Sequence, residues 1–134
     1  MKKLILSLLV AAFMGGNTLS AQTITKNEDG KYSLSVGHVT LTVDAQKGGK
    51  IVSYRYDDKE ILSQTKIPNS FGSTFWTSPQ SEWNWPPVPE YDTKPFNAEV
   101  AGDKLILTGE KSKRFGYRVR KELTTDKKDN AIVI

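Results

Sequence analysis

The sequence contains no cysteine and only one histidine, His38. The lack of cysteine excludes disulfide bonds, cysteine-ligated metal sites and thiol nucleophiles, so packing must hold the folded chain together. Calcium could be held by the oxygen atoms of Asp57, Asp58 and Glu60, but a turn rich in aspartate has a simpler structural reason to exist. Nothing in the sequence therefore indicates a cofactor or a metal ion.

Residues 1–21 have the layout of a secretory signal peptide. A positive start, Met1–Lys3, precedes the apolar run Leu4–Met14, and Ala21 supplies a small residue before Gln22. The apolar run is too short to span a bilayer comfortably, although a retained N-terminal anchor is the alternative. We expect cleavage after Ala21 and a mature protein, residues 22–134, that is periplasmic or secreted and free of the membrane.

The charge of the mature chain is small. Lys2 and Lys3 lie in the leader, so its removal lowers the formal net charge from +4 to +2. A charge of this size gives little reason to expect nucleic acid as a partner, and an exported protein rarely meets it. The oligomeric state is not indicated by the sequence.

Apolar residues alternate with polar ones along much of the mature chain, and no convincing helical period appears. In residues 32–36, for example, Tyr32, Leu34 and Val36 alternate with two serines. Such a period of two puts the apolar residues on one face of a strand and predicts an all-β, antiparallel β-sandwich over residues 22–134. Strands are expected at residues 32–36, 39–43, 50–56, 60–62, 97–100, 104–110, 115–123 and 131–134.

The last strand pattern, Ala131–Ile134, stands at the very end of the sequence. Natural domains seldom finish in the middle of an apolar strand, and β-sandwiches often need more residues than this chain has. We expect the chain to be the N-terminal part of a longer domain; a terminal core strand is the alternative.

Residues 63–95 differ from the rest because they contain all six prolines and all three tryptophans. Proline removes backbone donors and fixes φ, so regular strand pairing cannot run through this segment. A loop of this length is commonly functional or disordered, and its aromatic content argues against disorder. We call this segment the tryptophan loop.

The composition of the tryptophan loop is typical of a carbohydrate site. Indole rings suit the C–H faces of sugars, and neighbouring amide and carboxylate groups suit the hydroxyls. If the backbone is extended, Trp83 and Trp85 share one side, and the polar side chains between them share the other. The alternative is a structural or assembly module in which the tryptophans are core. The residues predicted to contact sugar are Trp76, Gln80, Glu82, Trp83 and Trp85.

Two segments resemble galactose mutarotase-like proteins. The segment DAQKGGKIVSYRYDDKEIL (44–62) resembles the early Gly-Gly, strand, turn and strand of that superfamily, and GSTFWTSPQSEWNWPP (72–87) resembles the matching loop of an exported bacterial branch. The resemblance implies a β-supersandwich, of which this chain is the first part, with carbohydrate bound in a cleft on one sheet. The histidine acid and glutamate base of mutarotases lie further along than this sequence reaches. Whether the protein is an enzyme therefore stays open, and its catalytic residues are unknown.

Two further patterns bear on chemistry. Glycoside hydrolysis needs two carboxylates, and Glu82 with Asp92 is an imaginable pair, although acidic residues of a loop are usually only solvated.

Basic residues concentrate between Lys111 and Lys121, where Arg118 and Arg120 would share a strand face. Such a face could meet an acidic sugar or a phosphate, and a solvated outer surface explains it equally well.

Overall fold

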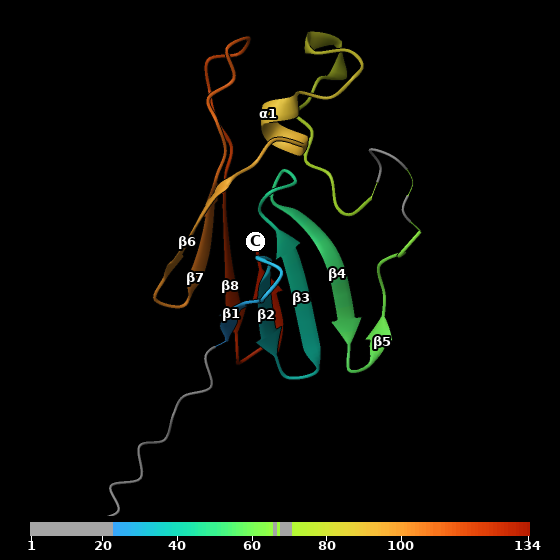
Figure 1. Ribbon diagram of the computed structural model, residues 1–134, viewed down its shortest axis with the longest axis vertical. Coiled ribbons are helices and arrows are strands. Elements are labelled where there is room, and N and C mark those ends of the chain that lie inside the picture. Colours follow the sequence, from blue (N-terminus) through green and yellow to red (C-terminus); the bar gives the residue numbers. More distant parts are fainter. Residues whose placement is uncertain (1–22, 66, 68–70) are drawn as a thin grey trace, which may run out of the picture.

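The computed structural model describes residues 23–65, 67 and 71–134 and shows two antiparallel β-sheets packed face to face (Figure 1). The predicted all-β antiparallel sandwich is confirmed. The predicted signal peptide lies outside the described residues. Within the described part of the chain, no helix is long and apolar enough to cross a membrane.

The first sheet is a meander in which each strand pairs with the next along the chain. Alternation of apolar and hydroxyl residues gives its strands one core face and one polar face, so that Leu34 pairs with Leu41 while Ser33 pairs with Thr42. The turn at Gly37–His38, where the alternation changes phase, joins two of them. The strands are β1 (Ile24–Lys26), β2 (Tyr32–Val36), β3 (Val39–Asp44), β4 (Lys50–Tyr56) and β5 (Lys59–Glu60).

The second sheet is also a meander and differs from prediction at one strand. Its strands are β6 (Asn97–Ala101), β7 (Lys104–Thr108), β8 (Arg120–Asp126) and β9 (Ala131–Val133). The alternation of Phe115, Tyr117 and Val119 predicted a strand over 115–123, but β8 begins only at Arg120. The preceding segment turns instead, because the Gly116 amide bonds back to the Ser112 carbonyl at 2.8 Å and Gly116 adopts a φ of 76°.

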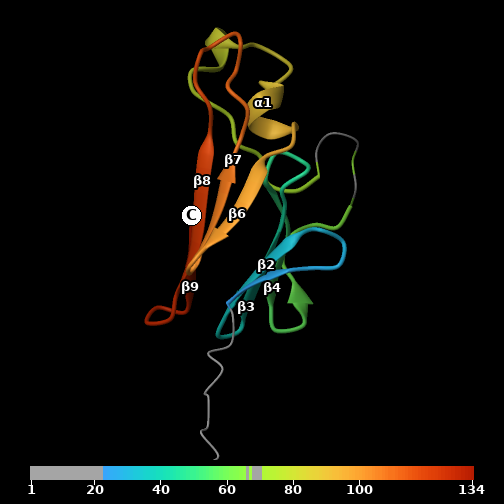
Figure 2. The ribbon, with the colours of Figure 1, turned by 60° about the vertical axis from the view of Figure 1, so that its left-hand side comes forward.

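The main core lies between the two sheets (Figure 2). Leu34, Leu105 and Leu107 are fully buried there, and β2 packs against β8 and β9. Burial of such side chains is the main favourable contribution to the folding of a chain without disulfides. The buried residues of this core are Ile24, Tyr32, Leu34, Leu41, Val43, Ala45, Phe96, Leu105, Leu107 and Leu123.

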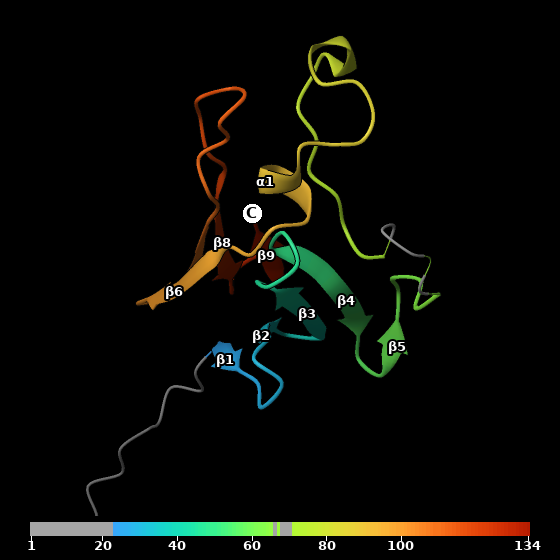
Figure 3. The same ribbon diagram turned by 45° about the horizontal axis from the view of Figure 1, so that its top comes forward.

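The connection between the sheets carries two short helices, the 3₁₀-helix η1 (Gln80–Glu82) and α1 (Pro89–Asp92). Helix α1 lies at one end of the sandwich, beside the turn between β3 and β4, and η1 lies beyond it (Figures 1 and 3). A second, smaller core forms here from Trp83, Val88 and Tyr91, with Phe115 packed against it. This small core attaches the tryptophan loop to the sandwich.

The turn Gly48–Gly49 brings α1 into direct contact with the first sheet. The Gly48 amide donates to the Lys94 carbonyl at 3.0 Å, and the φ of Gly48 is +68°. A Cβ atom on Gly48 would lie 2.0 Å from the carbonyl oxygen of Asp92. Only glycine permits both this backbone conformation and this close approach.

We expect Gly48→Ala to destabilise the fold far more than Gly102→Ala. Both glycines have positive φ, +68° and +62°, but a Cβ on Gly102 would meet no atom within 4 Å. Gly102→Ala should therefore cost only the backbone strain, about 1–2 kcal/mol, and Gly48→Ala should cost at least ~2 kcal/mol more because α1 must shift. Urea unfolding of both variants measures the difference; equal losses would show that α1 is not docked on this turn.

Candidate functional site

Trp83 anchors the tryptophan loop. Its side chain is buried, with 5 % of its surface exposed, and packs against Val88 and Tyr91. Its indole Nε1–H donates a hydrogen bond to the carbonyl of Thr77 at 2.9 Å. The buried ring therefore has its polar group satisfied, as buried indoles usually do. Of the three tryptophans predicted to contact sugar, this one is built into the small core.

Trp76 and Trp85 extend the cluster outward to solvent. The Trp76 ring lies 6.0 Å from that of Trp83, tilted by 58°, and 5.8 Å from that of Trp85, at 88° to it. Their exposed fractions are 47 % for Trp76 and 69 % for Trp85. The structure thus brings all three predicted tryptophans together, with two exposed rings meeting at a right angle over a buried third.

The polar residues predicted beside the tryptophans are placed differently from the extended geometry. Gln80 and Glu82 are exposed, but they lie on η1, and the Asn84 amide bonds back to the Gln80 carbonyl at 2.8 Å with a φ of 54° at Asn84. The alternation of sides expected for residues 80–85 is therefore wrong. Prolines at 79, 86 and 87 flank this short segment, and they favour turns over a paired strand.

Arg114 holds the tryptophan loop against the segment between β7 and β8. Its guanidinium donates to the carbonyl of Glu82 at 2.7 Å and to that of Trp83 at 3.2 Å. The same group lies over the ring of Phe115, 4.9 Å from the ring centre. A planar group with five donors suits this double role, which a lysine could not fill. In the sequence, Arg114 is one of the basic residues between Lys111 and Lys121, and no local pattern signals this contact.

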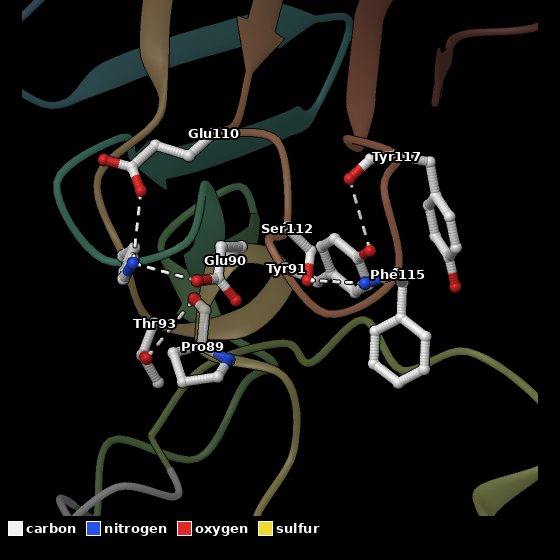
Figure 4. Close-up of polar contacts among 9 residues, drawn as sticks. Pro89, Glu90, Tyr91, Thr93, Glu110, Ser112, Phe115 and Tyr117 are labelled. Carbon is white, nitrogen blue, oxygen red and sulfur yellow. Dashed lines mark hydrogen bonds and ion pairs between the residues drawn. The ribbon is translucent and has the colours of Figure 1, made fainter. Parts of the chain in front are cut away.

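The segment after β7 is fastened to α1 by polar and aromatic contacts (Figure 4). The Tyr91 hydroxyl donates to the carbonyl of Tyr117 at 3.3 Å, and the two rings stack 5.3 Å apart. The hydroxyl oxygen of Ser112 accepts a hydrogen bond from the backbone amide of Phe115 at 3.3 Å. Burial is the main cause that raises the pKa of Tyr91. This hydroxyl consequently stays protonated and acts as a structural donor.

A lysine beside α1 bridges two carboxylates. Lys94 Nζ lies 2.9 Å from Glu90 and 3.1 Å from Glu110. The hydrogen bond to Glu90 is the main cause that raises the pKa of Lys94, and the same bond lowers the pKa of Glu90. Lys94 and Glu90 therefore stay charged at neutral pH, and the negative charge of Glu90 is compensated locally.

A hollow of about 380 Å³ opens beside the exposed ring of Trp85. Its lining combines apolar surface with charge, a mixture found in small-molecule sites. The residues that line it include Trp85, Pro86, Glu90, Ser112, Lys113 and Arg114.

A second and larger hollow, of about 820 Å³, lies over the polar face of the first sheet. Thr42, Asp44 and Ser53 line its floor from β3 and β4, and Asp29 and Lys47 line it from neighbouring turns. This hollow was not predicted from the sequence. The pattern that could have indicated it is that the outward positions of these predicted strands are hydroxyl or charged residues. No residue predicted to contact sugar lines this hollow.

The remaining candidates are engaged in local contacts. Asp92 is buried in an ion pair with Lys50, so it is not free to act as a second catalytic carboxylate with Glu82. His38 lies at the β2–β3 turn with its Nδ1 2.6 Å from Asp57 and its ring stacked on Tyr56. In the described part of the chain, no three acidic or histidine side chains converge as a metal site requires.

Lys121 points into the junction between the sheets and α1. Its ammonium donates to the carbonyls of Gly48 and Gly49, at 2.9 and 3.2 Å, and lies 5.1 Å from the centre of the Phe96 ring. The pKa of Lys121 is lowered to about 8, mainly by burial; Asp92 opposes the shift, and the nearby ammonium of Lys50 contributes to it. The structure thus gives this lysine a role inside the fold.

The Lys50–Asp92 ion pair should show strong coupling in a double-mutant cycle. The two side chains are 7 % and 6 % exposed and their charged atoms lie 2.9 Å apart. Lys50→Met or Asp92→Leu alone leaves a buried charge and should lower the unfolding free energy by about 3–5 kcal/mol, whereas the double variant should lose much less. Denaturant unfolding checks this. The exposed pair Lys104–Glu122 is the control and should contribute less than ~1 kcal/mol; additive losses at Lys50 and Asp92 would contradict the prediction.

The lowered pKa of Lys121 should make stability depend on pH. Between about pH 8 and 10.5 the unfolded chain keeps this proton while the folded chain loses it, so the unfolding free energy should rise with pH in that window. Lys121→Met should remove this part of the rise. NMR titration of ¹³C-methylated lysines measures the pKa directly, with Lys94 as the control because its pKa is raised. A Lys121 titration above that of Lys94 would refute the assignment.

Comparison with family models, with curated proteins and with solved structures finds no match for the chain in any of the three. The resemblance to galactose mutarotase-like proteins therefore stays a prediction from sequence.

Proposed function

We propose that this is an exported carbohydrate-binding protein and that the tryptophan loop is its sugar site. The observation that carries the proposal is the pair of exposed indole rings, Trp76 and Trp85, held at a right angle on a buried base. Large aromatic side chains gain by leaving water, so two exposed and adjacent rings favour a binding role.

The chemistry of a sugar fits this arrangement. The C–H face of a pyranose ring can stack on the exposed indole of Trp85 while its edge meets Trp76. The exposed amide of Gln80 and the carboxylate of Glu82 lie on the same loop and can bond to hydroxyl groups. The carboxylate of Glu82 is available for this because Arg114 donates its hydrogen bond to the backbone carbonyl of Glu82 and not to the side chain.

Preorganisation supports the proposal further. The backbone beneath the exposed rings is held by the Trp83 indole, which bonds to Thr77, and by Arg114, which bonds to two carbonyls. A loop that is ordered during folding loses less conformational entropy when a ligand arrives. The same contacts would be unnecessary in a loop that served only as a connection.

A structural or assembly module is the second candidate, and the burial of Trp83 favours it. That reading explains one tryptophan and its partners Val88 and Tyr91. It gives no reason for Trp85 to expose 69 % of its surface. Carbohydrate binding accounts for all three rings, with one as support and two as contact surface; we assign no catalytic residue.

Trp85→Ala should weaken glycan binding at least ~10-fold and leave stability nearly unchanged, because the ring is exposed. Trp83→Ala, which empties the small core, should instead cost about 3–5 kcal/mol of unfolding free energy. Tyr56→Ala removes an exposed aromatic ring from the β4–β5 hairpin and is the matched control.

Binding is measured on a panel of neutral and acidic oligosaccharides by calorimetry, with protection of tryptophan fluorescence from acrylamide as the second readout. Bound ligand should protect Trp76 and Trp85 of the wild-type protein from quenching by acrylamide. The same ligand should give less protection to the tryptophans that remain in Trp85→Ala. Full affinity in Trp85→Ala would rule out the tryptophan loop as the sugar site.

A further inference from the structure

The basic residues from Lys111 to Lys121 have different surroundings in the folded protein. Lys121 turns inward to the Gly48–Gly49 turn, and Arg120 forms an ion pair with Glu122. Lys113 and Arg114 instead line the hollow beside Trp85. The structure therefore selects two of the basic residues and places them next to an exposed indole.

The hollow beside Trp85 carries a net positive charge. Glu90 is its one described carboxylate, and Lys94 already pairs with it at 2.9 Å. Arg114 bonds only to neutral carbonyls, and neither it nor Lys113 forms an ion pair with any described residue. The field of Lys113 is also felt at Glu90, where it helps to lower the pKa after the larger effect of Lys94.

The uncompensated charge and the exposed ring line the same hollow, of about 380 Å³, which is at the small end of the range for small-molecule sites. A sugar ring stacked on Trp85 would thus present a substituent to Lys113 and Arg114. A neutral hydroxyl gains little there, whereas a carboxylate or sulfate forms the stronger, charge-assisted hydrogen bond.

We infer that the tryptophan loop selects sugars that carry a negative charge, and that Lys113 is the residue that recognises it. The inference rests on the proposed sugar-binding function and adds the ligand class. Arg114 contributes its charge while it holds the loop in place. The negative group is either the carboxylate of a uronic acid or a sulfate ester, which share the charge and the acceptor oxygens.

The larger hollow over the first sheet does not share this character. Two of its lysines already have acidic partners, Lys31 with Asp29 and Lys50 with Asp92. Asp44 lines the same hollow and adds a further negative charge to it. The contrast makes the hollow beside Trp85 the place where an anion is favoured.

The test compares the wild-type protein with Lys113→Gln and Lys111→Gln. Lys111 is exposed, lies two residues away and does not line the hollow, so its variant matches the charge change without the contact. Dissociation constants are measured for hexamers of galacturonic acid, of galactose 6-sulfate and of galactose, and unfolding curves verify that both variants fold.

We expect the wild-type protein to bind one of the anionic hexamers at least tenfold more tightly than the galactose hexamer. Lys113→Gln should weaken that binding about tenfold and leave the neutral hexamer unaffected, and Lys111→Gln should change it less than twofold. With the wild-type protein, raising sodium chloride from 50 to 500 mM should weaken binding of the anionic hexamer and should not weaken binding of the neutral one. This comparison tests the charge without any substitution. The tighter of the two anionic hexamers identifies carboxylate or sulfate.

Failure of the inference and failure of the proposed function give different results. Equal affinity for neutral and anionic hexamers, or an anionic affinity unchanged in Lys113→Gln, overturns the selection of charge while sugar binding stands. Absence of binding to all three hexamers and to a broad glycan panel overturns both.

Discussion

The buried ion pair between Lys50 and Asp92 is the constraint on which the rest of the structure depends. It joins the first residue of β4 to the last residue of α1, with both side chains at most 7 % exposed. Burial of two charges is costly, and such a pair specifies a geometry more than it adds stability. Here it links α1 to the first sheet, and the close approach of Gly48 to the Asp92 carbonyl leaves no space for a side chain on that turn.

The position of α1 in turn determines the candidate site. Tyr91 is nearly inaccessible, and with Val88 it forms the surface on which the Trp83 ring is buried. Trp83 supports Trp76, and Trp76 meets Trp85, so each exposed ring rests on a more buried one. Arg114 closes this arrangement from the opposite segment by bonding to the backbone of Glu82 and Trp83. The proposed binding surface is therefore supported by packing that begins at the ion pair.

Local patterns predicted the fold well where each strand has one core face, as in β2, β3 and β4. The prediction failed at residues 115–119, where aromatic alternation serves the small core beside Trp83 and a glycine turn replaces the strand. The tryptophans of the site were visible from composition, but their different burial was not, because it depends on α1. Neither the Lys50–Asp92 pair, separated by 42 residues, nor the role of Arg114 has a signal in local sequence.

The basic segment shows why a charge pattern alone does not reveal a role. Its lysines are similar in sequence, yet Lys121 bonds to two glycine carbonyls inside the junction, whereas Lys113 is exposed and lines the hollow beside Trp85. The difference follows from the turn at residues 112–116, which reverses the chain so that β8 carries Lys121 back along the sandwich while Lys113 stays beside the tryptophans. Desolvation lowers the pKa of Lys121 to about 8, which costs stability while this lysine is charged. Lys113 is exposed and lines the hollow beside Trp85, where we propose that its charge meets a ligand.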